Sequence, residues 1–150
     1  ELTVLTNSLR TVETLAVKNN IRTICLGGEY SARNEDFTGV VAERPLSEFL
    51  INKAFFSCSS LGTDGYLREG NENKAHLKQK MLLASERKYL LLDASKFLQP
   101  SFARICHYRD VDFLITDSLK DKELQQELAW NGVNIIDCSR RQYATQLINQ

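Results

Sequence analysis

The stretch "KYLLLDASKF" (88–97) decides the fold class, because a short apolar run in it gives way abruptly to polar residues. The apolar half is typical of a strand buried in a parallel sheet. Asp93, Ser95 and Lys96 follow directly, in a turn too short and polar to be a simple linker. In open α/β sheets, ligands bind at the carboxyl ends of the strands. We therefore predict a strand over 88–93 that delivers these three side chains to a binding edge.

The rest of the chain repeats this alternation of short apolar runs with longer amphipathic stretches. Strands are predicted over 2–6, 22–26, 53–59, 112–117 and 133–137, and helices over 8–18, 40–50, 72–85 and 121–132. Segments 28–39 and 60–71 are predicted as polar loops, and 139–150 as either a short helix or a frayed end. The alternation predicts a single α/β domain over residues 1–150, with a mainly parallel sheet in a three-layer sandwich.

Local signals refine the predicted helices. Ser8 or Asn7 is the expected N-cap of the first helix, and Asp121 that of the last. Pro45 should break the helix over 40–50 or lie in its first turn. In the helix over 72–85 the apolar residues recur near the helical period, so the lysines between them are expected to face solvent.

Polar residues follow several predicted strands and are expected to converge on one edge of the sheet. They are Asn7, Gly27, Gly28, residues 57–62, residues 93–96 and Asp117. Lys96 has three donors on a flexible stem, which suits a phosphate monoester, although a solvent-exposed turn lysine is the alternative. Ser59, Ser60 and Gly62 supply hydroxyls and backbone amides for an anion nest, or simply form a turn. Neither glycine-rich nucleotide-binding fingerprint is present.

Composition narrows the function classes. Lys plus Arg and Asp plus Glu both count 19, so no broad basic face for nucleic acid is expected from this stretch. Four cysteines lie far apart without zinc-ligand spacing, which favours free thiols in a reducing cytoplasm and predicts no metal and no cofactor. The chain opens without a charged-then-apolar leader, and no apolar run approaches the length that spans a bilayer. We therefore expect no membrane association.

Acid–base catalysis is not favoured by the ionisable residues. The carboxylates near predicted loops are Asp64, Glu69, Glu72, Asp93 and Asp117, and caps, turns and solvated faces explain most of them. Proton transfer needs two groups with separated pKa values in one water-poor pocket, which sequence spacing does not establish. His76 and His107 have no evident nucleophilic partner. The residues alone thus favour a binding domain over an enzyme.

A set of ordered motifs gives the chain a specific resemblance. In sequence order they are "VLTNS", "LGGEYSARNEDFTG", "NKAFFSCSSLGTDG", "NKAHLKQKML", "LLLDASKF", "FARI" and "VDFLITD", between about residues 2 and 138. Their order and spacing resemble the carboxyl-terminal effector domain of the DeoR family of bacterial transcriptional repressors. The resemblance implies a Rossmann-like fold shared with ribose-5-phosphate isomerase, glucosamine-6-phosphate deaminase and coenzyme A transferases. It also implies a homo-oligomer in which a phosphorylated sugar controls operator DNA binding by an amino-terminal winged helix-turn-helix domain.

The resemblance also assigns residues. Asn7 matches the family's Thr-Asn pair, Gly27 and Gly28 its Leu-Gly-Gly turn, Lys78 its helical lysine, and Asp93, Ser95 and Lys96 its Asp-Ser-Ser-Lys-Phe turn. The departures are Lys74 where the family usually has glutamate, Ser57 and Ser60 at small Gly/Ala positions, and Ala94 for the first serine. These departures put the identity of the ligand in doubt. The family's phosphate loop and DNA-binding domain are expected upstream of Glu1, outside this stretch.

Two other functions stay open at this point. The first is a sugar-phosphate isomerase or deaminase of the same fold, although the acidic cluster of such enzymes is missing where this chain reads "SCSSLGTDG" (57–65). The second is an oligomerisation module without a ligand. We predict a non-enzymatic sensor domain that binds a phosphorylated sugar.

Overall fold

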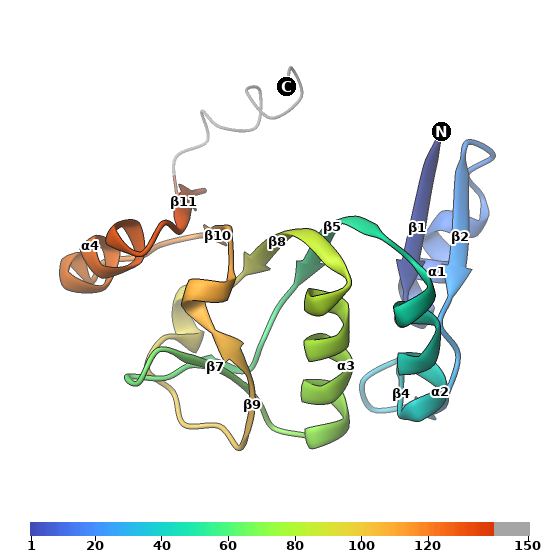
Figure 1. Cartoon of the computed structure of the whole chain (residues 1–150), viewed down its shortest axis with the longest axis horizontal. Helices are drawn as coiled ribbons and strands as arrows, with labels where there is room; N and C mark the ends of the chain where they lie inside the picture. The colour runs from blue at the N-terminus through green and yellow to red at the C-terminus, as the bar shows by residue number, and fades with distance from the viewer. Residues whose placement is uncertain (140–150) are drawn as a thin grey trace.

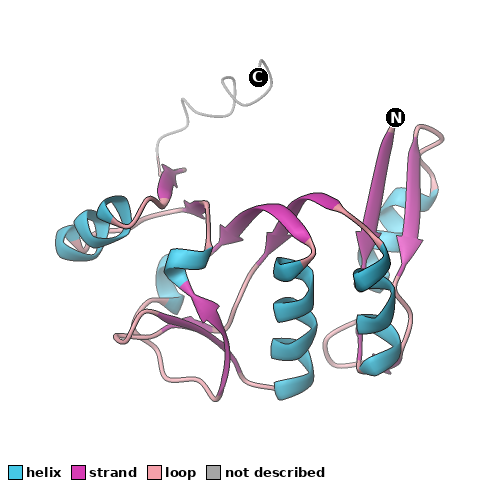
Figure 2. Ribbon diagram, viewed as in Figure 1, coloured by secondary structure: helices cyan, strands magenta, loops and turns pink. Residues whose placement is uncertain are grey.

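The computed structural model describes residues 1–139, as α-helices and short 3-10 helices around a mainly parallel sheet (Figures 1 and 2). The strands are β1 (Leu2–Thr6), β2 (Ile21–Cys25), β3 (Glu29–Ser31), β4 (Asp36–Thr38), β5 (Ile51–Phe56), β6 (Ser60–Leu61), β7 (Tyr66–Glu69), β8 (Ser85–Leu91), β9 (Ala103–His107), β10 (Phe113–Thr116) and β11 (Asn134–Asp137). The helices are α1 (Leu9–Ala16), α2 (Val40–Glu43), α3 (Glu72–Leu83) and α4 (Lys122–Trp130), with 3-10 helices η1 (Arg44–Glu48), η2 (Ala94–Lys96) and η3 (Tyr108–Asp110). The prediction for 140–150 lies outside the described residues.

Two groups of parallel strands carry the fold. β5, β8, β10 and β11 pair in the order β11-β10-β8-β5, and all three pairings are parallel. β1 and β2 form a separate parallel pair. The predicted α/β class and mainly parallel sheet are therefore confirmed, and every predicted strand is present within a few residues of its expected bounds.

The connections of the four-stranded sheet all lie on one of its faces. In sequence order, β5, β8, β10 and β11 are added one after another in the same direction across the sheet. Right-handed crossover connections that all progress in one direction lie on the same face of a sheet. The main core fills that side, where α3, α4 and the segment around β9 pack against the sheet. Its largest members are Leu61, Leu67, Leu90, Leu92, Tyr108, Leu114 and Leu128, each at most 2% exposed.

Helix α3 joins this core to the β1–β2 unit. Ala75 and Leu82 face the main core, whereas Leu77 packs in a smaller cluster with Leu26 and Leu46. Figure 1 shows α3 between the four-stranded sheet and α2. Helix α3 therefore packs against both clusters, and its residues line one cavity together with the ends of β1 and β5.

The segment over 60–71 is not the loop that the sequence predicted. β6, β7 and β9 form an antiparallel layer, and β9 was not expected at all. The turn between β6 and β7 ends at Gly65, whose φ of 77° lies in the left-handed region that glycine adopts without strain. Asp64-Gly65 between apolar residues is a recognised hairpin signal, so the sequence did contain the information.

The segment over 28–39 also contains a hairpin instead of a loop. β3 and β4 pair antiparallel, with the rings of Tyr30 and Phe37 5.2 Å apart. The hairpin is fastened to the end of β1, because Asn7 Nδ2 donates to the Phe37 carbonyl at 3.0 Å and the Phe37 amide donates to the Asn7 carbonyl at 2.8 Å. The prediction failed because the strands are only three residues long and most of their neighbours are polar.

Helix ends agree with the local signals. Ser8 caps α1 and Asp121 caps α4, each accepting a backbone amide in the first turn. The helix predicted over 40–50 is split into α2 and η1, and Pro45 lies at the start of η1. Within residues 1–139, no helix is long and apolar enough to cross a membrane.

Candidate functional site

Ser57, the residue after β5, is the meeting point of two lysines. Lys78 on α3 donates to the Ser57 carbonyl at 2.6 Å. Lys96 of η2, at the end of β8, donates to the Ser57 hydroxyl at 3.2 Å. Because β5 and β8 are neighbouring parallel strands, Ser57 and Lys96 meet at one rim although they are distant in sequence, and α3 brings Lys78 to the same serine.

Lys78 lies in a largely buried ion pair, which we call the Lys78–Glu69 cluster. Its ammonium is paired with the Glu69 carboxylate, and the Ser59 hydroxyl donates to the other carboxylate oxygen at 2.8 Å. Burial alone would raise the pKa of Glu69, but the hydrogen bond and charge of Lys78, with the Ser59 hydrogen bond, outweigh it and lower that pKa. The expectation that the lysines of α3 face solvent is wrong for Lys78, because its ammonium neutralises this buried carboxylate.

Lys96 lies in a more open setting, at the end of a tightly organised turn. Asp93 Oδ1 accepts the amide of Ser95 at 3.0 Å and also its hydroxyl. These hydrogen bonds, with the nearby Lys96 charge 3.5 Å away, lower the pKa of Asp93. Asp117, after β10, accepts the amide of Ala94 at 2.8 Å. The turn is therefore fixed by two carboxylates while the Lys96 side chain remains 34% exposed at the rim.

A cavity of about 250 Å³ opens beside Ser57. The end of β1 forms one wall, the end of β5 another, and α3 contributes the third. Its lining residues are Asn7, Ser8, Asn34, Asp36, Phe55, Phe56, Ser57, Lys74, Leu77, Lys78 and Met81. Two residues chosen from the sequence, Asn7 and Lys78, therefore line one cavity together with Ser57.

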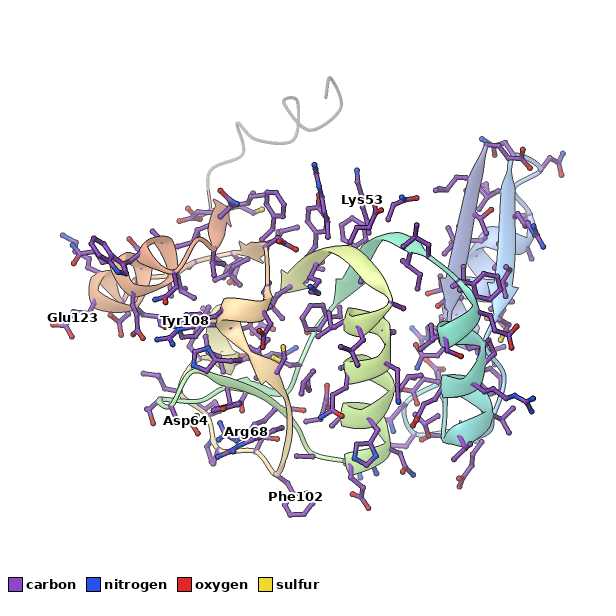
Figure 3. The ribbon with its side chains drawn as sticks, viewed as in Figure 1. Lys53, Asp64, Arg68, Phe102, Tyr108 and Glu123 are labelled. Carbon is purple, nitrogen blue, oxygen red and sulfur yellow. The ribbon has the colours of Figure 1, made fainter. Side chains whose placement is uncertain are left out.

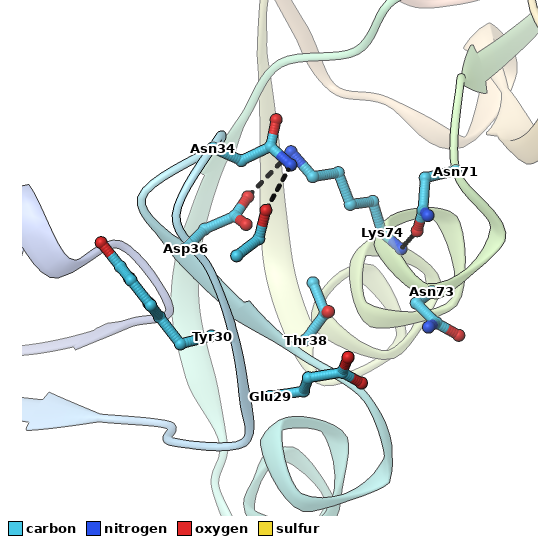
Figure 4. Close-up of a pocket in the computed structure, with 9 residues that line it drawn as sticks. Glu29, Tyr30, Asn34, Asp36, Thr38, Asn71, Asn73 and Lys74 are labelled. Carbon is cyan, nitrogen blue, oxygen red and sulfur yellow. Dashed lines mark hydrogen bonds and ion pairs between the residues drawn. The ribbon is translucent and has the colours of Figure 1, made fainter.

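A second cavity of about 260 Å³ lies on the other side of Asp36 and Lys74 (Figure 4). The Lys74 ammonium is 2.9 Å from Asp36 Oδ2, and this ion pair lines both cavities. Asp36 Oδ1 is buried and has no hydrogen-bond partner among residues 1–139. Sequence reasoning missed Asp36 because it lies in the hairpin predicted as a loop, and noted Lys74 only as a departure from the family pattern.

The other residues chosen from the sequence do not line the first cavity. Gly28, with φ 107°, packs so closely on the Thr38 carbonyl that a side chain would clash. Gly27, with φ 70°, forms the turn before it. The Ser60 side chain is fully buried, and Gly62 lies against Arg68 in the β6–β7 turn.

The charged groups of the site are mostly engaged with one another. Lys74 is paired with Asp36 and Lys78 with Glu69, whereas Lys96 is 34% exposed and lies 3.5 Å from the half-exposed Asp93 carboxylate. Glu69 is held ionised by Lys78, so it is poorly suited to exchange protons near neutral pH. Asp64 is paired with Arg68 at 2.5 Å, which lowers its pKa. Of the carboxylates named for proton transfer, Asp64, Glu69, Asp93 and Asp117 are each engaged in an ion pair or a hydrogen bond.

Similarity to known proteins shows which family this chain belongs to. A family model described as the DeoR C terminal sensor domain matches residues 1–118. An L-fucose operon activator of Haemophilus influenzae is 40% identical over 124 residues, 83% of this chain and 50% of the relative. An uncharacterized HTH-type transcriptional regulator of Bacillus subtilis, YulB, is 38% identical over 79% of this chain and 46% of its own length. A lactose phosphotransferase system repressor of Staphylococcus epidermidis is 33% identical over 81% of this chain and 50% of its own length.

These matches settle the class of the chain, which spans about half the length of the curated relatives. The relatives are named as regulators, and the sensor-domain model covers the rim, the cavity and the Asp93–Lys96 turn. The chain therefore belongs to the DeoR family of transcriptional regulators and contains its carboxyl-terminal sensor domain.

Proposed function

We propose that this domain binds a phosphorylated sugar and thereby changes the DNA affinity of a helix-turn-helix domain elsewhere in the full-length regulator. The observation that carries the proposal is the Lys96 ammonium, which lies at the strand-end rim within 3.2 Å of the Ser57 hydroxyl and next to a polar cavity. A lysine ammonium has three N–H donors, and a lysine in an ordered turn is a common ligand for a phosphate monoester.

Each part of the ligand has a candidate partner. The phosphate would contact Lys96 and the Ser57 hydroxyl, because both are at the rim and Lys96 is partly exposed. Hydroxyls would reach the first cavity, which Asn7 and Asp36 help to line. Asp93 and Ser95 would act mainly by fixing the turn that carries Lys96. In this division of roles, the sensor discriminates phosphorylated from free sugars at Lys96.

The names of the relatives support a sugar-related regulon. Two of them refer to an L-fucose operon and a lactose phosphotransferase system, and a third is named as an HTH-type regulator. We infer that the full-length regulator is a cytoplasmic homo-oligomer that binds operator DNA and has no catalytic activity. The phosphate loop of the family would enter on a strand between β1 and β5, because each has only one paired neighbour among residues 1–139.

A thermal-shift panel on the full-length regulator tests the proposal. Glucose 6-phosphate, fructose 1-phosphate and glycerol 3-phosphate are compared with glucose, fructose, glycerol and inorganic phosphate. A ligand at 100 times its Kd stabilises by about 2.7 kcal/mol, which corresponds to a Tm increase of a few degrees. At least one phosphorylated compound should raise Tm while its free counterpart does not.

The control variant is Lys80→Ala, which removes an exposed lysine from α3. It should keep the response, and Lys96→Ala should lose it. Equal shifts with phosphorylated and free sugars would contradict a phosphate-dependent sensor. Aldose–ketose turnover by the regulator would instead favour the isomerase alternative.

A further inference from the structure

The β3–β4 hairpin presents one polar face to the amino end of α3. Side chains alternate between the two faces of a strand, and residues paired across two strands share a face. Glu29 is paired with Thr38, and Ser31 with Asp36. All four residues line the second cavity, together with residues from the start of α3 (Figure 4). We call this surface of four polar residues the hairpin face.

The second cavity is joined to the first. Asn34, Asp36 and Lys74 line both, so the Lys74–Asp36 ion pair is part of the wall of each cavity. The cavities measure about 250 and 260 Å³, whereas pockets that hold a small ligand usually measure about 300 to 1,000 Å³. Each cavity alone is smaller than that range, and the two together lie within it. The geometry therefore favours a single site that extends from the Ser57 rim to the hairpin face.

The hairpin-face end of this site has an excess of negative charge. Two carboxylates, those of Glu29 and Asp36, line the second cavity with one ammonium, that of Lys74. The ammonium is 2.9 Å from Asp36 Oδ2, and Asp36 Oδ1 is buried without a hydrogen-bond partner among residues 1–139. Glu29 is exposed and has no ion-pair partner in the same part of the chain. One of the two carboxylates therefore remains without a neutralising cation.

The amino end of α3 also borders the second cavity but does not reverse this balance. A helix N-terminus carries about half a positive charge. However, the Asn71 side chain already accepts the Lys74 amide at 3.1 Å, and Glu72 adds a carboxylate in the first turn. A second anionic group on a ligand would therefore be repelled here, whereas a hydroxyl can donate to a carboxylate and accept from an ammonium.

We propose that the hairpin face holds the uncharged, hydroxyl-bearing end of the effector and rejects compounds with a second anionic group at that end. The inference rests on the proposed function, because it takes the phosphate to lie at Lys96. Ligand hydroxyls would donate to the exposed Glu29 carboxylate and accept from Lys74, which has three donors. Glu29 and Asp36 are thereby specificity-determining residues, since their charge decides which phosphorylated sugars bind.

Three matched pairs of compounds test the inference on the full-length regulator. Each pair compares a phosphate monoester with an analogue that has a second anionic group at the other end of the molecule. The pairs are fructose 1-phosphate with fructose 1,6-bisphosphate, glucose 6-phosphate with 6-phosphogluconate, and glycerol 3-phosphate with 3-phosphoglycerate. In titration calorimetry, the monoester that binds best should bind at least about tenfold more tightly than its analogue, because charge repulsion acts on the analogue alone.

Charge-neutral variants assign this preference to the hairpin face. The double variant Glu29→Gln with Asp36→Asn removes both negative charges and nearly preserves the side-chain shapes. The ratio of the two affinities should then fall by about threefold or more. Glu29→Gln alone changes only an exposed side chain, so it should shift the ratio in the same direction even if the double variant does not fold.

The matched control is Glu123→Gln, which neutralises an exposed glutamate on α4, at the opposite end of the molecule from the hairpin (Figures 1 and 3). It should leave the ratio unchanged. Equal affinities within every pair, or a preference for the monoester that both Glu29 variants retain in full, would overturn the inference and leave the proposed function intact. Absence of binding by all three monoesters would overturn the proposed function and this inference with it.

Discussion

The two lysines that flank Ser57 differ in what surrounds their ammonium groups. Lys78 is bonded to the Ser57 carbonyl and to a carboxylate that is 9% exposed, so its charge is neutralised inside the protein. Lys96 reaches the Ser57 hydroxyl from a rim turn, and its nearest carboxylate, at 3.5 Å, is 48% exposed. The same side chain thus stabilises the fold in one place and remains available to a ligand in the other.

The largest expected effect comes from removing the buried lysine. Lys78→Ala leaves Glu69 ionised without its partner in a largely buried position. Breaking a buried ion pair in this way costs about 3 kcal/mol of unfolding free energy. Urea denaturation measures the loss.

Lys80→Ala on the same helix removes an equivalent but exposed side chain and should change stability by less than about 0.5 kcal/mol. The double variant Lys78→Met with Glu69→Gln removes both charges and should recover much of the loss. If Lys78→Ala were as stable as Lys80→Ala, the Lys78–Glu69 cluster would not be a structural element.

Removing the rim lysine, Lys96, should weaken ligand binding and leave the stability of the unliganded protein almost unchanged. Lys96→Ala deletes one charge-assisted hydrogen bond to the ligand, worth about 1.5 to 3 kcal/mol. The Kd for the sugar phosphate that gives the strongest thermal shift should rise roughly 10- to 100-fold by titration calorimetry. Stability without ligand should change little, because the side chain is partly exposed. Lys96→Arg keeps the charge and should retain part of the affinity; a variant that unfolds easily but binds normally would reverse the assignment.

Acid should weaken the Lys78–Glu69 cluster, because protonation of Glu69 removes the negative charge that Lys78 neutralises. The folded-state pKa of Glu69 lies below its ordinary value of 4.5, so the stabilisation is complete above that pH and is lost as pH falls through the lowered value. The stability difference between wild type and Lys78→Ala should therefore shrink below pH 4.5 in urea titrations. A difference that stays constant into acid would mean that Glu69 is not held ionised by Lys78.

The smallest effect is expected at Asp117, which orients the rim turn from β10. Asp117→Ala removes the acceptor of the Ala94 amide, and water can replace it because the site is exposed. The loss of order should weaken sugar-phosphate binding by about 0.5 to 1 kcal/mol, or roughly two- to fivefold in Kd. Asp117→Asn retains an acceptor and serves as the control. A larger effect than that of Lys96→Ala would make Asp117 a direct ligand contact.

Most of the parallel sheet could be predicted from the sequence, because buried parallel strands form continuous apolar runs such as "YLLLD" (89–93). The antiparallel parts could not be predicted in the same way. β3 and β4 are three residues long, so neither gives a clear alternating pattern. β9 includes Arg104 and His107 among its five residues, and only its pairing with β7 makes it a strand.

The site was predictable as a set of strand ends and unpredictable as a set of contacts. Lys96, Asp93 and Ser57 follow strands, and parallel pairing brings strand ends together. The partner of Lys78 was not predictable, because Glu69 reaches it only after β7 folds back against α3. Asp36 lines the cavity through the β3–β4 hairpin, which was not expected to be ordered as strands.

Lysine labelling of the full-length regulator by an amine-reactive acetylating reagent tests the contrast between the two lysines most directly. Mass spectrometry follows each site with and without the sugar phosphate that gives the strongest thermal shift. Lys96 should react readily alone and become protected with ligand, Lys78 should be protected in both states, and Lys80 should react in both. Labelling of Lys96 that ignores the ligand, or of Lys78 that equals Lys80, would contradict the account.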